Sequence, residues 1–167
     1  NRPGMSTLME GDHPPAAREL PAVERSRVDA DAASDEIDDQ VNEAEASGGV
    51  YEIRRDRLAA LDPDLIVTQG LCDVCAVDRV VVREAVADLG LDADLLTVDV
   101  HTLEDLFDSI GEIGAALGRE ERADELVGDL GERVGAVERA TADVEERPRT
   151  AVLDWTDPVM VAGHWIP

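Results

Sequence analysis

Two short apolar runs on either side of an amphipathic segment constrain the fold of this chain most strongly. Residues 65–68 (Leu-Ile-Val-Thr) and 95–98 (Leu-Leu-Thr-Val) are bounded by turn signals, which is typical of strands buried in a parallel sheet. Between them, residues 77–89 repeat apolar side chains at helical spacing. A strand, a helix and a second strand in this order predict an open parallel α/β sheet. Residues 1–33 carry helix-breaking prolines, so loops and extended segments are expected there.

Further helices and a third strand follow from the same patterns. Ser34 resembles an N-cap, with acidic residues after it, and predicts a helix to about residue 46. A short helix is expected over residues 55–61. Residues 103–144 have helical spacing throughout, and Gly118 divides them into two helices, the second of them long. Residues 151–153 (Ala-Val-Leu) predict a third strand.

The charge of the chain excludes several kinds of partner. The sequence holds 39 acidic and 15 basic residues, all of the latter arginine, for a net charge of −24. Such a chain repels nucleic-acid phosphates and anionic lipid headgroups, so neither is expected to bind. Because 44% of the residues are hydrophobic, a core can still form. The composition indicates adaptation to molar salt, where the Debye length is about 3 Å; a skewed genome composition is the alternative.

Targeting and membrane signals are absent from the sequence pattern. No stretch approaches the ~18 apolar residues that a membrane-spanning helix needs, so direct membrane insertion is not expected. No secretory signal opens the chain, which predicts a cytoplasmic protein if this start is native.

Candidate ligand-binding residues follow the first predicted strand directly. Gln69, Cys72, Asp73 and Cys75 lie in the loop after it, and ligands of open α/β sheets bind at the carboxyl ends of strands. Two thiols at C-x-x-C spacing can face one ligand, bind a soft metal or close a disulfide. The structural alternative is a pair of partly buried small apolar residues.

A second group of candidates follows the third predicted strand. Trp155, His164 and Trp165 suit stacking on a large flat ligand, or its axial ligation; the alternative is that both tryptophans are core residues. No nucleophile elbow, phosphate-binding loop or dinucleotide fingerprint occurs, so hydrolase, nucleotide-binding and dehydrogenase functions have no support. An enzyme is therefore not expected.

Several of these segments resemble a known family. The chain is similar to the cobalamin-binding-protein group of the iron-complex and vitamin B12 substrate-binding superfamily from about Glu10 to Pro167. The segments that carry the resemblance are Leu20-Pro21, Ser26-Arg27-Val28-Asp29, Glu36-Ile37-Asp38, Val50-Tyr51, residues 61–69, residues 72–77, residues 154–158 and residues 162–165. The family's His-Glu-Cys-Asp element corresponds to Met9-Glu10-Gly11-Asp12, which lacks the histidine and the cysteine.

The resemblance implies a two-lobed binding protein without catalysis, with ligand held in a cleft. Residues 1–118 would form a partial Rossmann-like N-terminal lobe, residues 119–147 a connecting spine helix, and residues 148–167 the first strand and loop of a second lobe. Compared with that fold, the chain is expected to be incomplete at both ends. The implied ligand is cobalamin or a related metal chelate, the implied partner an ABC permease; transport members of the family are exported. The implied ligand-binding residues are Gln69, Cys72, Asp73, Cys75, Trp155, His164 and Trp165.

Two other hypotheses remain open at this point. The first is a thiol-based metal-binding or redox protein in which Cys72 and Cys75 carry the function. The second is a degenerate fragment that binds no ligand.

Overall fold

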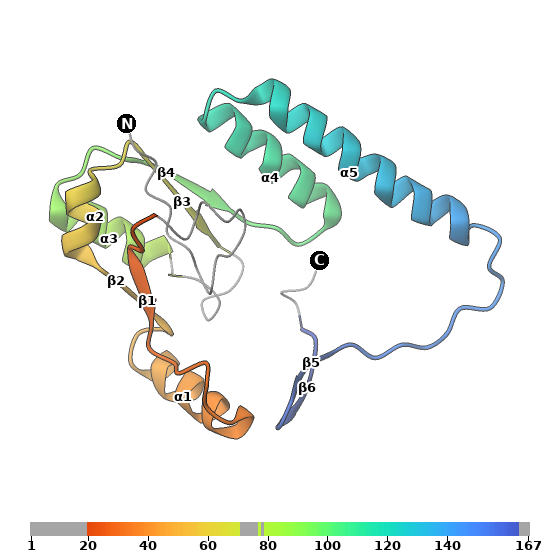
Figure 1. Cartoon of the computed structure of the whole chain (residues 1–167), viewed down its shortest axis with the longest axis horizontal. Helices are drawn as coiled ribbons and strands as arrows, with labels where there is room; N and C mark the ends of the chain where they lie inside the picture. The colour runs from red at the N-terminus through yellow and green to blue at the C-terminus, as the bar shows by residue number, and fades with distance from the viewer. Residues whose placement is uncertain (1–19, 71–76, 78, 164–167) are drawn as a thin grey trace. The chain divides into compact units, whose positions relative to one another are not determined.

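A computed structural model describes residues 20–70, 77 and 79–163 of the chain (Figure 1). The described residues form two compact units: the first runs to Val98 and includes Thr156–Pro158, and the second consists of Asp99–Trp155 and the described residues from Val159 on. The first unit contains β1 (Glu24–Ser26), α1 (Ser34–Ala46), β2 (Tyr51–Ile53), α2 (Arg55–Leu61), β3 (Leu65–Gln69), α3 (Arg79–Leu89) and β4 (Asp94–Val98). After it come α4 (Leu103–Ala116), α5 (Glu120–Thr141), β5 (Leu153–Thr156) and β6 (Val159–Val161).

The predicted parallel unit is confirmed. β3 and β4 pair in parallel, with Ile66 opposite Leu95 and Gln69 opposite Val98, and α3 connects them. The helix begins at Arg79 rather than at residue 77. The α/β fold class expected from the sequence therefore holds.

The core of the first unit lies between α1, α3 and the strands. Its buried residues are Ala44, Val50, Tyr51, Val77 and Val82, and partly buried side chains of β3 and β4 pack against them. This arrangement covers the side of β3 that carries Ile66, whereas the neighbouring Val67 is 46% exposed. Alternate side chains of a strand point to opposite faces, so one face of this strand carries the packing.

Three strands of three residues, β1, β2 and β6, lie in places where the sequence pattern predicted none. β1 falls in the segment expected to be irregular, and it pairs antiparallel with β2, Arg25 opposite Glu52. Three residues are too few to show the alternation of apolar and polar side chains by which a strand is predicted from a sequence. The start of α1 also differs slightly: Ser34 is the first helical residue, and Ala33 occupies the N-cap position.

Helices α4 and α5 form an antiparallel helical hairpin (Figure 1). Gly118 lies in the left-handed region at φ 61° and reverses the chain between them, as expected from its place in the sequence. Gly114 and Ala123 are both buried where the helices meet. No helix in the described ranges is both long enough and apolar enough to cross a membrane.

The last two strands form a local hairpin. β5 and β6 constitute a two-stranded sheet across the Asp157–Pro158 turn. The predicted third strand is therefore present, but it begins two residues later than expected and pairs with β6 within its own two-stranded sheet. A neighbour reached through a short turn costs little loop-closure entropy, which favours this local pairing.

Candidate functional site

Both ends of the cysteine-bearing segment are fixed at the carboxyl end of β3. Where the segment leaves the strand, the Gly70 N–H donates to the carbonyl of Val98 at 2.8 Å. Where it returns, the Thr68 hydroxyl donates to the carbonyl of Val77 at 3.2 Å, and the Val77 side chain is buried in the core. Residues 70–77 thus start and finish at the sheet edge where ligands of α/β proteins bind.

Two of the seven predicted ligand-binding residues fall within the described ranges. Gln69 is the last residue of β3 and is half-buried, and Trp155 is a half-buried residue of β5. Gln69 belongs to the first unit and Trp155 to the second. The other five lie outside the described residues, so their roles stay predictions: Cys72, Asp73, Cys75, His164 and Trp165.

The polar cluster that follows β4 has a structural explanation. The Asp105 carboxylate accepts the backbone N–H of His101 at 3.0 Å and that of Thr102 at 2.8 Å. The Thr102 hydroxyl in turn accepts the N–H of Asp105 at 3.1 Å, which completes a capping box at the start of α4. Hydrogen bonds from the His101 N–H and from Thr102 hold the pKa of Asp105 below its usual value. This histidine therefore lies in a helix cap, where its ring also contacts Asp99 (Nε2–Oδ1, 3.0 Å).

No described residues form a candidate metal centre. The described ranges contain no group of three or more His, Cys, Asp or Glu side chains that could hold a metal ion. The thiols of Cys72 and Cys75 lie outside those ranges and are untested as metal ligands.

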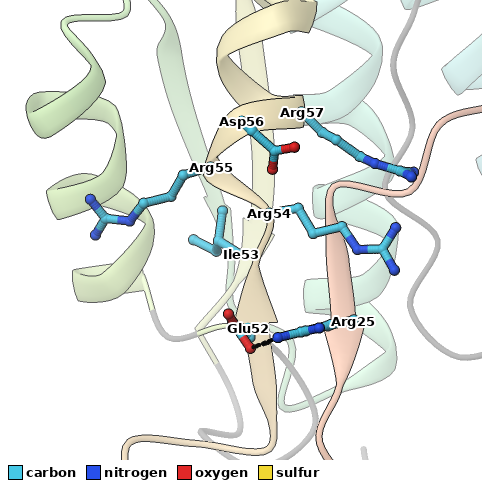
Figure 2. A pocket seen from close by; sticks show the side chains of 7 residues that line it. All are labelled: Arg25, Glu52, Ile53, Arg54, Arg55, Asp56 and Arg57. Carbon is cyan, nitrogen blue, oxygen red and sulfur yellow. Dashed lines mark hydrogen bonds and ion pairs between the residues drawn. The ribbon is translucent and has the colours of Figure 1, made fainter.

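A groove that the sequence pattern did not reveal opens on β1, β2 and the start of α2. It has a volume of about 540 Å³ and is lined by Arg25, Glu52, Ile53, Arg54, Arg55, Asp56 and Arg57 (Figure 2). We call it the arginine groove. One feature of the sequence could have indicated this groove. Residues 25–57 contain five of the fifteen arginines, in a chain that is otherwise strongly acidic.

An ion pair joins β1 and β2 in the lining of this groove. Arg25 donates from Nε and Nη2 to the same oxygen, Oε2, of Glu52, at 3.0 and 2.8 Å. The Arg25 guanidinium holds the pKa of the Glu52 carboxyl below its usual value, and the charge of Arg27 adds to this effect. The carboxylate therefore stays ionised at neutral pH and offsets one of the arginine charges.

Comparison with protein families decides the class of the molecule. The periplasmic binding protein family matches residues 15–165, which is nearly the whole chain. The chain belongs to the periplasmic binding protein family. No curated protein and no solved structure gave a significant match. Members of this family are substrate-binding proteins of the iron-complex and vitamin B12 type, so the match confirms the superfamily to which the sequence segments pointed.

Proposed function

We propose that this periplasmic binding protein binds a corrinoid or a closely related metal chelate at the carboxyl end of β3 and β4, without catalysing a reaction. The observation that carries the proposal is the attachment of residues 70–77 at both ends to that sheet edge. Ligands of open α/β sheets bind at the carboxyl ends of strands, which is where these two hydrogen bonds lie. Delivery of the ligand to an ABC permease is the corresponding biological role.

The chemistry of the candidate residues suits such a ligand. The Gln69 side chain offers an amide donor and a carbonyl acceptor at the strand end, and corrinoids carry amide groups around their periphery. Trp155 offers a flat aromatic surface of the kind that stacks on large planar ligands. Cys72 and Cys75 add thiol sulfur, a soft ligand for a transition metal, and His164 adds imidazole.

A titration of the chain with aquocobalamin tests this proposal. We expect a saturable change in the visible spectrum in roughly 2 M KCl, where charge repulsion is screened, together with co-elution of the corrinoid and the protein. Gln69→Ala should raise the Kd by about fivefold, because one hydrogen bond is worth about 1 kcal/mol. Asn42→Ala removes an exposed amide on α1 and serves as the matched control, with an unchanged Kd.

The thiols are tested in the same assay with Cys72→Ser/Cys75→Ser. A spectral change that disappears in this variant assigns the thiols to the corrinoid site, whereas a retained change removes them from it. If the folded chain shows no saturable change, the proposal is wrong. Binding of Zn²⁺ or Co²⁺ that depends on both cysteines would then favour the thiol-based metal function.

A further inference from the structure

We propose that the arginine groove binds a small oxyanion with two or more negative charges, of the pyrophosphate or polycarboxylate class. The inference does not depend on the proposed corrinoid function, because it rests on different residues. The groove lies within the first unit and is formed by β1, β2 and the first turn of α2.

Strand alternation places the side chains of Arg25, Glu52 and Arg54 on one face. Glu52 and Arg54 are two residues apart and share a face of the extended chain, and Arg25 lies opposite Glu52 in the antiparallel register. Figure 2 shows the Arg54 and Arg57 side chains extending to the same side, over β1. The Arg55 side chain extends to the other side, where its Nη1 pairs with Asp88 at 2.6 Å. Arg54 and Arg57 are thus the two arginines best placed to act together.

Most of the hydrogen-bond donors of these two arginines are unused within the described ranges. The Arg57 side chain makes one long hydrogen bond, from Nη1 to the carbonyl of Ala22 at 3.4 Å. No hydrogen bond or ion pair from the Arg54 side chain to a described residue is found. Each guanidinium carries five N–H donors in a planar fork that matches the oxygens of phosphate or carboxylate groups. Two such forks on one side suit an anion with several oxygens better than a halide ion.

The local charge of the groove is opposite to that of the whole chain. Its four arginines and two acidic residues sum to 4 − 2 = +2, or +1 when Asp88, the partner of Arg55, is included, against −24 for the chain. At about 0.1 M salt the Debye length is about 10 Å, so an anion inside the groove experiences chiefly the local positive charge. The volume of about 540 Å³ leaves ample room for such a small anion.

Isothermal titration calorimetry with inorganic pyrophosphate and, separately, with citrate tests the proposal. The titrations use the 167-residue chain at about 0.3 M KCl, an ionic strength with a Debye length of several ångströms. Circular dichroism verifies that each variant is folded. We expect saturable binding of at least one probe, and the tighter probe identifies the phosphate or the carboxylate class. Arg54→Gln/Arg57→Gln should raise the Kd by about tenfold or more, since charge-assisted hydrogen bonds are lost.

Two further variants separate a built site from diffuse charge. Arg133→Gln/Arg139→Gln makes the same change in net charge on exposed positions of α5 and should leave the Kd within about twofold, because neither arginine lines the groove. Glu52→Gln removes an acidic side chain and releases Arg25, and it should tighten binding. The proposal is overturned if the folded chain binds neither probe saturably, if the α5 variant loses as much affinity as the groove variant, or if Glu52→Gln weakens binding.

Discussion

A single carboxylate organises the first turn of α4. Asp105 accepts backbone N–H groups from His101 and Thr102, and its own N–H is bound by the Thr102 hydroxyl. These bonds lower the pKa of Asp105 in the folded state relative to about 3.9 in the unfolded chain. A lowered folded-state pKa contributes stability that is present above the unfolded value and is lost as the pH falls through the folded value.

We expect Asp105→Asn to lower the melting temperature at pH 7 and to have progressively less effect below about pH 4, where the unfolded carboxyl becomes protonated. Thermal unfolding by circular dichroism between pH 7 and pH 3 measures the difference between the two proteins. Asp108→Asn changes an exposed carboxylate of the same helix and is the control. A deficit of Asp105→Asn that stays constant over the whole pH range would show that the ionised charge does not stabilise the helix start.

Close packing of two helices depends on the absence of one methyl group. A Cβ atom built on Gly114 of α4 would overlap the Cβ of Ala123 on α5. Gly114→Ala should therefore destabilise the chain by about 1–3 kcal/mol, the usual cost of overpacking. Chemical denaturation measures this loss.

Gly111→Ala is the matched control on the same helix. A Cβ at Gly111 meets no atom within 4 Å. The substitution should therefore stabilise the chain by about 0.5–1 kcal/mol through helix propensity. Equal effects of the two substitutions would contradict the inferred contact between α4 and α5.

Elements with a long apolar face could be predicted from the sequence, and locally paired elements could not. The predicted ranges agree with the structure to within about a residue for α1, α2, β3 and β4. This agreement is expected because the apolar side chains that form the repeating sequence pattern are the ones that pack. α5 ends at Thr141, three residues before the predicted end of the helical spacing at residue 144 and six before the end of the implied spine helix at residue 147, and the acidic side chains of Asp143, Glu145 and Glu146 provide a reason. Negative charges are unfavourable at a helix C-terminus, where the backbone carbonyls already carry partial negative charge.

The two candidate sites differ in the same way in how far the sequence predicts them. The position of Gln69 at the end of β3 could be predicted, because the strand and the residues after it are contiguous in the sequence, and its role in binding stays a prediction. The arginine groove could not be predicted from the sequence. It brings Arg25 together with residues 52–57 through the pairing of β1 with β2, and no periodic pattern in the sequence indicates that pairing. The sequence does contain a local excess of arginine. This excess is informative only because the rest of the chain is strongly acidic.

At the scale of the whole molecule, charge sets the conditions for stability. With a net charge of −24, the compact state of the chain is opposed by self-repulsion, which salt reduces. Part of this charge repulsion can be located on α1, which has acidic residues in its first turn and no basic residue in its last turn. Asp35, Asp39 and Glu43 are exposed there and lie four residues apart, so like charges face each other along one side of the helix.

Neutralising two of these side chains should lower the salt requirement of the chain. Asp39→Asn/Glu43→Gln changes the net charge from −24 to −22 and removes two repulsive pairs, each worth about 0.2–0.5 kcal/mol at low salt. We expect the variant to melt at a higher temperature than the unmodified chain at about 0.2 M KCl, and the difference to shrink at about 2 M KCl, where the Debye length is shorter than the spacing of the charges. Melting curves of both proteins over a KCl series measure this convergence. An advantage of the same size at both salt concentrations would mean that the substitutions act through backbone propensity, and that charge repulsion along α1 does not limit folding.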